Sequence, residues 1–376
     1  MKNAQGVLSK VVYFVLTYGI VRTAFKIIGR SERLSKYFRL PVFGRQRGVA
    51  VIGCGQYARS TISYFLYSSS RCRVVACYDL NGESAKRMAQ LWPGCYVAQT
   101  SADAINHTGV DIVFIASNHH SHTDYFCDAV RAKKLVHVEK PPFVNFAQYR
   151  AFSQALISDS KPGQVMIGFN RPHSVLARKF YNKLTPSVTM TATVFGHQLP
   201  KSHWYRNDAE GLRICGNLGH WIDLFVHLLQ GQTAGEWSIN FVLNDSSGCD
   251  ADSDDNFVVV LRAPNGALAS ISLVAKQELV TGIYEVIAVQ GENGSLIIDD
   301  YKSYRWIDSV SNRRESSWHK DVGHKVMLIS HGKDKTQREA ELVDNRTNQA
   351  LVSAYITLII LQMCRARGES LKFCLL

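Results

Sequence analysis

One lysine and one aspartate–histidine pair carry the chemistry that this sequence offers. Lys140 lies in the tripeptide Glu139-Lys140-Pro141, directly after an apolar run that reads as a buried strand. Asp223 and His227 stand at positions i and i+4 of a predicted helix, so they share one face of it. A histidine can take a proton from a hydroxyl, and a lysine can stabilise the alkoxide that develops. These residue types are typical of hydride transfer at a carbinol.

A glycine-rich turn upstream of Lys140 predicts a dinucleotide site. The apolar strand 48–52 runs into Gly53-Cys54-Gly55-Gln56-Tyr57-Ala58, which is the G-x-G-x-x-A form of the fingerprint. The first glycine permits the tight turn, and the second lets the backbone approach a pyrophosphate. The alanine keeps the next helix close to the strand, and the helix N-terminus faces the negative charge. All six residues except Cys54 are therefore candidate cofactor contacts.

An acidic residue at the end of the next strand indicates which cofactor is preferred. The predicted strand Cys72–Tyr78 runs into Asp79. A carboxylate at this position bonds the ribose hydroxyls of the adenosine and repels a 2′-phosphate, so the sequence favours NAD over NADP. Arg59 and Lys86 are nearby bases that weaken this preference. An alternative is that Asp79 serves only the turn before Asn81 and Gly82.

A third predicted strand, 111–117, runs into the polar loop Asn118-His119-His120-Ser121-His122. The three histidines lack carboxylate partners at useful spacing, so no metal site is expected here. The acidic run 250–256 lacks the glycine and terminal glutamate of an EF-hand calcium loop, so no metal is expected there either. A fourth strand, 135–139, delivers Lys140. The expected cofactor contacts of this half are Ser117, Asn118, His119, Glu139 and Lys140.

The order of these motifs resembles that of the Gfo/Idh/MocA oxidoreductase family (glucose-fructose oxidoreductase, inositol dehydrogenase and relatives). The resemblance rests on the glycine turn, the acidic residue, the Asn/His-rich loop, Glu-Lys-Pro and then Gly168-Phe169-Asn170-Arg171, and it covers about residues 48–330. It implies that Lys140, Asp223 and His227 converge on a substrate carbinol. It also implies that the C-terminal sheet serves as an oligomer face, so we expect a homo-oligomer.

The expected substrate contacts are Asn170, Arg171, Arg213, Asn217 and His220, and either arginine could clamp a phosphate or carboxylate. The polar loop and the 211–216 segment are similar to members linked to bacterial surface-polysaccharide synthesis, which makes a nucleotide sugar an attractive substrate. Three positions depart from the family pattern. Gly211-Leu212 stands where several glycines are common, Asn217 where an acid is common, and Pro142 where an aliphatic residue is common. The first two leave the choice of substrate open.

Alternation of apolar and polar residues places several strands between about 185 and 307, separated by the turns Pro264-Asn265-Gly266 and 291–294. We therefore expect an α/β protein. An N-terminal Rossmann domain (48–168) would carry a doubly wound parallel sheet, and a C-terminal α+β domain (169–376) a mostly antiparallel sheet.

Residues 1–47 form a separate, basic extension. They hold ten bases and one acid, a balance of +9 out of a net +12 for the 376 residues, so the remaining chain is nearly neutral. A nucleic-acid-binding core is therefore not expected. The apolar-rich stretch 7–28 is interrupted by Lys10, Arg22 and Lys26 and is too short to span a bilayer. It predicts a basic helix at an anionic membrane surface, or a helix packed on the protein itself or on a partner subunit. Removal as a targeting segment is a further alternative.

Nine scattered cysteines without a C-x-x-C pair indicate a reducing, cytoplasmic location, with membrane association through 1–47 as an addition. The expected function is reversible, NAD-dependent oxidation of a secondary alcohol on a sugar, cyclitol or nucleotide sugar. Two alternatives stay open: a non-catalytic NAD-binding regulator, and a glycosidase that uses bound NAD transiently.

Overall fold

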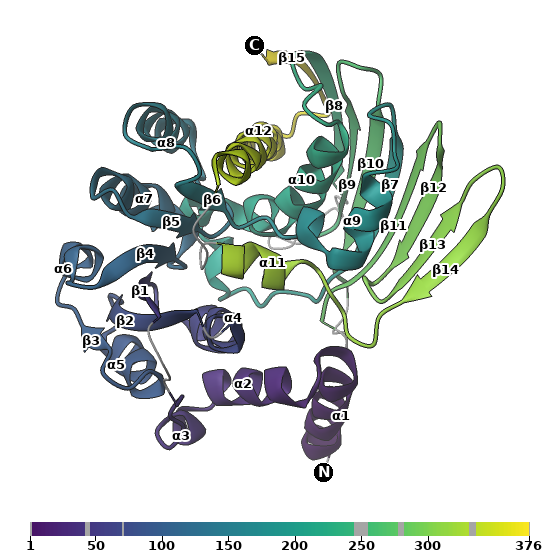
Figure 1. Cartoon of the computed structure of the whole chain (residues 1–376). Helices are drawn as coiled ribbons and strands as arrows, with labels where there is room; N and C mark the ends of the chain where they lie inside the picture. Colours follow the sequence, from purple (N-terminus) through teal and green to yellow (C-terminus); the bar gives the residue numbers. More distant parts are fainter. Residues whose placement is uncertain are drawn as a thin grey trace. The chain divides into compact units, whose positions relative to one another are not determined.

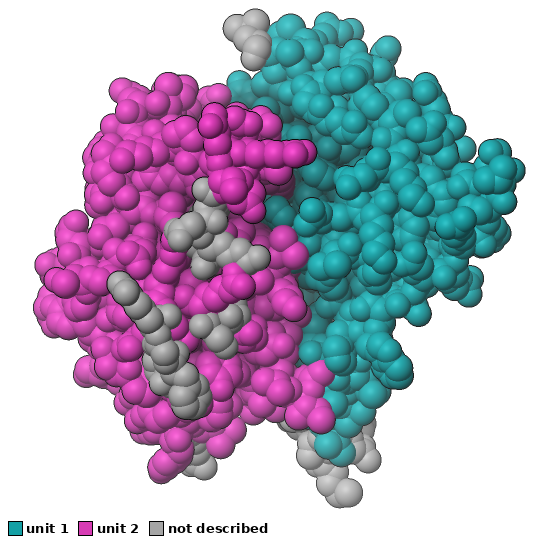
Figure 2. Space-filling model, viewed as in Figure 1, with its two compact units in different colours: residues 1–18, 169–323, 349–376 teal, residues 19–168, 324–348 magenta. Residues whose placement is uncertain are grey.

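The computed structural model describes residues 2–41, 46–69, 71–243, 255–276, 282–330 and 336–375. The chain divides into two compact units, which Figure 2 colours separately. The parallel-sheet unit comprises residues 19–168 and 324–348, and the antiparallel-sheet unit comprises residues 1–18, 169–323 and 349–376. The domain boundaries at residues 47 and 168 stay predictions.

The parallel-sheet unit contains a six-stranded sheet in the order β3-β2-β1-β4-β5-β6, with every pairing parallel. This is the strand order of a doubly wound nucleotide-binding fold, so the Rossmann prediction is confirmed. The sheet explains the continuous apolar runs, because strands covered on both faces need no polar side. Its strands are β1 (Arg47–Ile52), β2 (Cys72–Tyr78), β3 (Tyr96–Val97), β4 (Val110–Ile115), β5 (Leu135–Val138) and β6 (Val165–Ile167).

Helices connect these strands (Figure 1). The helix after β1 begins at Gln56, passes through a π-helical turn, η1 (Ala58–Ile62), and continues as α4 (Ser63–Ser69). The others are α5 (Gly82–Leu91), α6 (Ser101–Asn106), η2 (His119–Ser121), α7 (His122–Arg131) and α8 (Phe146–Ser158). α11 (His324–Ile329) belongs to the same unit but follows β14 (Asn312–Ser316) in the chain.

The N-terminal extension forms two helices and a short third one instead of one amphipathic helix. α1 (Lys2–Tyr18) belongs to the antiparallel-sheet unit, whereas α2 (Ile20–Arg30) and α3 (Glu32–Ser35) belong to the parallel-sheet unit. The break falls at Gly19, whose φ of 85° is a left-handed conformation that glycine adopts without strain. α2 buries Thr23, Phe25 and Gly29, so this helix packs on the protein's own body, which is one of the alternatives predicted.

The antiparallel-sheet unit is built on nine strands in the order β14-β13-β12-β11-β7-β10-β9-β8-β15. Among the described residues of this sheet only the β7–β10 pair is parallel, so the prediction of a mostly antiparallel sheet is confirmed. The strands are β7 (Thr189–Phe195), β8 (Gly235–Leu243), β9 (Phe257–Arg262), β10 (Leu268–Val274), β11 (Tyr284–Gly291), β12 (Gly294–Asp299), β13 (Ser303–Ile307), β14 (Asn312–Ser316) and β15 (Ser370–Leu375).

Helices cover the inner face of this sheet, where Phe225 of α10 (Gly219–Leu228) packs edge-on against Trp237 of β8 at 6.2 Å. α10 follows a second π-helical turn, η6 (Ile214–Leu218). Shorter helices are η3 (Arg171–His173), α9 (Val175–Tyr181), η4 (Trp204–Arg206) and η5 (Asp208–Glu210). The last helix, α12 (Gln337–Ala366), has the length and composition of a membrane span, but 61% of its most apolar window is buried inside the protein. That burial fits a packed core helix.

Candidate active site

The glycine turn has the geometry that a dinucleotide pyrophosphate requires. Gly53 has φ +88°, and a Cβ on it would lie 2.3 Å from the backbone nitrogen of Ser117. Gly55 is exposed, and a Cβ there would meet nothing within 4 Å, so its backbone faces open space. The helix begins at Gln56 and Tyr57, and Ala58 is fully buried beneath it. The turn therefore fits a bound phosphate at a helix N-terminus.

Beside this turn lies a cavity of about 210 Å³ that matches the adenosine end of the site. Asp79 is fixed in it from both sides, because Oδ2 accepts from the Cys54 amide (2.7 Å) and Oδ1 accepts from the Asn81 amide (2.8 Å). Each carboxylate oxygen keeps a second lone pair for a ribose hydroxyl. The cavity is lined by Ile52, Gly53, Tyr78, Asp79, Leu80, Ser117, Asn118 and Tyr125.

Four of these lining residues were not predicted from the sequence: Ile52, Tyr78, Leu80 and Tyr125. Leu80 directly follows Asp79 in the sequence, and this position is a signal that sequence reasoning could have used. In the structure Leu80 is 82% exposed. Tyr125 lies in α7 and packs edge-on against Tyr78 at 6.4 Å, a contact that no local pattern reveals.

The two bases that weakened the preference for NAD have partners of their own. Arg59 is buried and donates to the Cys54 and Gly29 carbonyls. Lys86 is exposed and pairs with Glu83 at 2.8 Å. Neither lines the cavity that contains Asp79, so the site keeps its acidic character.

A buried histidine joins the polar loop to the turn that follows Lys140. His122 Nδ1 lies 2.7 Å from the Pro141 carbonyl oxygen, and its Nε2 lies 3.0 Å from the Ser117 carbonyl oxygen. Burial holds the pKa of His122 below its usual value, because the charged ring would lose its hydration. His119 is also buried, with its ring 5.9 Å from that of His122. Among the described residues no cluster of metal-ligating side chains occurs, and residues 250–254 of the acidic run lie outside them.

Glu139 is held by the glycine-turn helix and by its own strand. Tyr57 donates its hydroxyl to Glu139 Oε1 at 3.0 Å, and His137 Nε2 lies 3.2 Å from the same oxygen. His137 is fully buried and stacks on Phe114 at 4.8 Å. Lys140 follows directly and is half-buried at the carboxyl end of β5, the end at which α/β sheets bind ligands.

In the antiparallel-sheet unit, α10 carries the predicted acid–base pair. Asp223 is fully buried, His220 is 8% exposed, and His227 is half-buried. His227 Nδ1 lies 3.1 Å from Gln349 Oε1, and its ring meets Tyr181 edge-on at 6.1 Å. Since Lys140 belongs to the other unit, its convergence with Asp223 and His227 stays a prediction.

Arg171 is part of a buried charge network (Arg171, Glu285, Lys320 and Asp300). Its guanidinium pairs with Glu285 of β11 at 3.1 Å and donates to Asn170 Oδ1 at 2.8 Å. Trp221 of α10 donates to Glu285 Oε2 at 2.7 Å, and Lys320 lies 3.9 Å from Glu285 and bonds Asp300. Burial opposes ionisation of Glu285, but Arg171 and Lys320 outweigh it and hold the pKa of that carboxyl below its usual range.

Arg213, like Arg171, pairs with a buried carboxylate. It is 1% exposed, donates to Asp255 Oδ1 at 2.8 Å and to the His197 carbonyl at 2.9 Å, and shares Asp255 with Arg206. Asn217 is half-buried on η6. Substrate binding by Arg171 and Arg213 stays a prediction, and both arginines have a buried carboxylate partner within their own unit.

The departure at Gly211-Leu212 has a structural consequence. Gly211 has φ 78° and Leu212 has φ 55°, so both are left-handed. Glycine adopts this conformation without penalty, whereas leucine is strained in it. A glycine at position 212 would therefore relieve the strain of the turn before α10.

Comparison with known proteins agrees with this geometry. The NAD-binding Rossmann model of the Gfo/Idh/MocA oxidoreductases matches residues 47–169, and the C-terminal alpha/beta model matches residues 187–357. The chain belongs to this family. The family assignment agrees with a turn and cavity that fit NAD, whereas residues 1–46 lie outside both matches.

Curated relatives include inositol 2-dehydrogenases. That of Gluconacetobacter diazotrophicus is 28% identical over 192 residues, which are 49% of this chain and 55% of that protein. That of Rhizobium meliloti is 26% identical over 236 residues, 61% of this chain and 69% of that protein. The first alignment thus spans only about half of the relative.

Solved structures share the fold. Levoglucosan dehydrogenase in complex with NADH and levoglucosan has a TM-score of 0.68 at 15% identity, covering 87% of this chain and 99% of that chain. The myo-inositol dehydrogenase from Lactobacillus casei, in complex with NAD(H) and myo-inositol, has a TM-score of 0.64 at 16% identity, covering 88% and 98%.

Proposed function

We propose that this protein is an NAD-dependent dehydrogenase that reversibly oxidises a secondary alcohol of a sugar or cyclitol. The observation that carries the proposal is the glycine turn with its Asp79 cavity, followed on the same sheet by half-buried Lys140. The acid–base pair on α10 supports it, as do relatives named inositol 2-dehydrogenase.

Each proposed catalytic residue has a distinct task. Bound NAD would supply the hydride acceptor. An amide oxygen only accepts hydrogen bonds, so Gln349 favours the proton on His227 Nδ1 and leaves the Nε2 lone pair to take the hydroxyl proton. Asp223 would orient His227 or the substrate, and Lys140 would stabilise the developing alkoxide.

The test is NAD titration of the full chain followed by absorbance assays with a panel of cyclitols, sugars and nucleotide sugars. We expect substrate-dependent NADH formation that Lys140→Ala and His227→Ala abolish. Exposed Lys325→Ala and His319→Ala are matched controls and should retain activity. NAD binding without net reduction, or release of a reducing sugar without NADH, would favour the regulator or the glycosidase. Failure of the wild-type protein to bind NAD would refute all three functions.

The finer choice of substrate is also a proposal. The proposal that the substrate is a nucleotide sugar of surface-polysaccharide synthesis rests on sequence similarity. The names of the relatives point instead to inositol and levoglucosan. The panel separates them, because a nucleotide-sugar enzyme should show a kcat/KM at least tenfold higher for a nucleotide sugar than for the free cyclitol.

We propose a homo-oligomer formed through the outer face of the nine-stranded sheet. Phe195, Val258, Val260 and Leu268 are each about 40% exposed on its central strands, at 39%, 38%, 37% and 41%. Val260→Lys should lower the mass measured by light scattering if this face associates. An unchanged mass would refute the interface.

We also retain two proposals about location. The scattered cysteines support a cytoplasmic location. A lipid surface is a proposed partner of α1, where Leu8, Val12 and Leu16 are 65%, 49% and 66% exposed at helical spacing. Sedimentation with anionic vesicles tests the contact, and Leu16→Ser should reduce it.

A further inference from the structure

A single arginine connects the glycine turn to the N-terminal extension. Arg59 lies in η1 and is only 9% exposed. Its NH1 donates to the Cys54 carbonyl within the turn at 2.5 Å, and its NH2 donates to the Gly29 carbonyl near the end of α2 at 3.2 Å. The guanidinium is therefore held between the phosphate turn and a segment that neither family model includes.

The backbone of α2 at Gly29 packs closely against Ser60, in the helix after the turn. A Cβ on Gly29 would lie 2.8 Å from Ser60 Cβ and 3.1 Å from the Ser60 nitrogen. Ser60 in turn donates its hydroxyl to the carbonyl of Gln56, the first residue of that helix. Glycine at position 29 thus brings α2 into contact with the helix whose N-terminus faces the phosphate.

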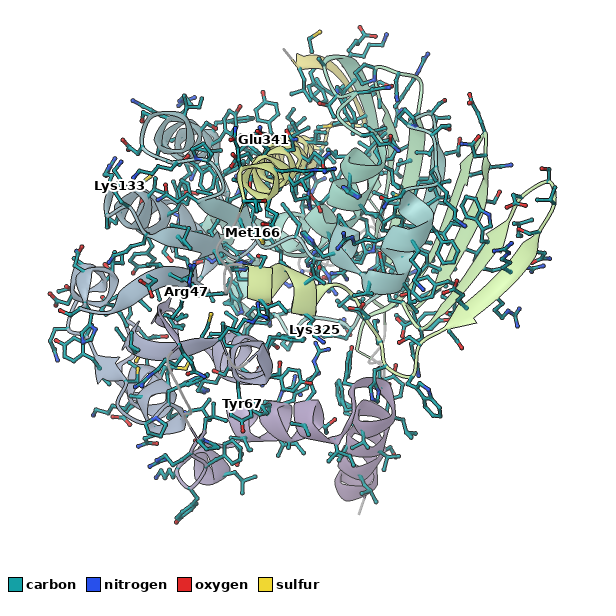
Figure 3. The ribbon with its side chains drawn as sticks, viewed as in Figure 1. Arg47, Tyr67, Lys133, Met166, Lys325 and Glu341 are labelled. Carbon is teal, nitrogen blue, oxygen red and sulfur yellow. The ribbon has the colours of Figure 1, made fainter. Side chains whose placement is uncertain are left out.

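Aromatic packing fixes α2 along the rest of its length. Phe25 is 3% exposed, and its ring lies 5.4 Å from Tyr64 and 5.9 Å from both Tyr67 and Phe38. Tyr67, a residue of α4, is labelled in Figure 3. Arg22 places its guanidinium 4.9 Å over Phe65. The extension is docked on η1 and α4 by an apolar contact as well as by the arginine.

The position of Arg59 has a direct consequence for the turn. In a trans peptide the C=O and N–H groups point to opposite sides. Because Arg59 holds the Cys54 carbonyl, the Gly55 N–H of the same peptide points away from Arg59. Gly55 itself is exposed. The Cys54 N–H is fixed separately by Asp79 at 2.7 Å. Both peptides of the turn are thereby held in one orientation.

We propose that Arg59 is a positioning residue that aims the Gly55 N–H at the dinucleotide pyrophosphate, and that α2 belongs to the cofactor site because it holds Arg59 in place. The inference rests on the NAD site proposed above. It gives residues 20–30 a role in cofactor affinity. Loss of this support should weaken NAD binding while the hydride-transfer residues, which lie elsewhere, keep their geometry.

The test compares NAD affinities of full-length variants by fluorescence titration. Arg59→Met removes two charge-assisted hydrogen bonds and should raise the Kd for NAD about ten- to hundredfold. The KM for NAD should rise in parallel, while kcat at saturating NAD stays within about threefold. Ile20→Ser and Lys86→Met are controls, because Ile20 is 73% exposed on α2 and Lys86 is an exposed base of the same unit. Both should bind NAD like the wild type.

Gly29→Ala provides a second variant. Alanine favours helix formation over glycine, so any loss of NAD affinity must come from the collision with Ser60 and not from a weaker helix. We expect the Kd to rise at least about threefold. Unchanged Kd values in Arg59→Met and Gly29→Ala, with melting temperatures like the wild type, would overturn the proposal.

Hydrogen exchange on the wild-type protein needs no variant and covers the case in which Arg59→Met does not fold. NAD should slow exchange in residues 20–30 together with residues 53–60. Protection confined to the turn, with none in α2, would refute the coupling. If the wild type binds no NAD, the cofactor assignment itself fails, which is a different result from equal binding by wild type and variants.

Discussion

Replacing Glu285 with glutamine should uncouple the two segments that frame the proposed substrate site. Glu285 is fully buried and receives hydrogen bonds from Arg171, beside Asn170, and from Trp221, beside His220. Arg171 also lies over the Trp221 ring at 5.1 Å. The carboxylate thus fixes the start of η3 and the first turn of α10 relative to each other. Glutamine keeps the shape but removes the charge.

The expected cost follows from the burial of the network. Without the Glu285 charge, Lys320 keeps its pair with Asp300, whereas Arg171 loses its carboxylate partner in this network. Removing one partner of a buried ion pair costs about 3–5 kcal/mol. For a unit of this size, that corresponds to a melting temperature lower by roughly 6–20 °C. Trp221→Phe loses one hydrogen bond to a charged group and should cost about 1.5–3 kcal/mol.

The pH dependence of this loss distinguishes a charge effect from a packing effect. The pKa of Glu285 is lower in the folded protein than its usual 4.5. Its stabilisation is therefore complete above the unfolded pKa and is lost as the pH falls through the folded pKa. The difference in unfolding free energy between wild type and Glu285→Gln should be constant near neutral pH and shrink below about pH 4.5.

Urea unfolding at several pH values, with NAD titration alongside, measures both effects. The affinity for NAD should stay within about twofold of the wild type, because the glycine turn belongs to the other unit. Turnover of any substrate found should fall, because Asn170 and α10 lose their common anchor. A destabilisation below about 1 kcal/mol, or one that persists unchanged at pH 3, would refute the reasoning.

Three further changes test single features of the sites. Gly53→Ala should raise the Kd for NAD more than about tenfold, because the alanine Cβ would lie 2.3 Å from the Ser117 nitrogen and because φ +88° strains alanine. A normal NAD affinity in titration would contradict the turn geometry. Leu212→Gly should stabilise the protein by up to about 1 kcal/mol in urea unfolding, because φ 55° strains leucine. A loss of stability would mean that the packing of the Leu212 side chain outweighs the strain. Gln349→Leu should lower kcat about two- to tenfold at unchanged NAD affinity, because the proton on His227 Nδ1 loses its acceptor; an unchanged kcat would exclude this orienting role.

Local patterns were sufficient for the scaffold. β2 begins and ends at the predicted residues, Cys72 and Tyr78, since a buried strand leaves a clear signal in composition and spacing. The parallel sheet followed from the alternation of strands and helices and from the glycine turn. By contrast, β15 pairs with β8 across more than a hundred residues, and no local pattern encodes such a pairing.

The arginines show why the site was harder to predict than the fold. Arg171 and Arg213 were expected to bind an anionic substrate, because an arginine next to a predicted cleft is a suitable anion clamp. In the structure the nearest anions are Glu285 and Asp255, which lie 114 and 42 residues away in the sequence. Which carboxylate neutralises a buried cation depends on tertiary contacts. Sequence spacing alone therefore identifies the residue type but not its partner.

The same argument applies to the extension. An apolar helix with three bases predicts an interfacial or a protein-packed helix with equal justification, because both need one apolar face and tolerate charge on the other. The decisive feature is Gly29, whose lack of a side chain is useful only against a specific neighbour, Ser60. A glycine near the end of a helix is ordinarily interpreted as a terminator. Here the helix continues to Arg30, and the glycine allows the backbone contact that places its carbonyl within reach of Arg59. If that contact controls NAD affinity, truncation before Arg47 would remove part of the cofactor site along with the extension.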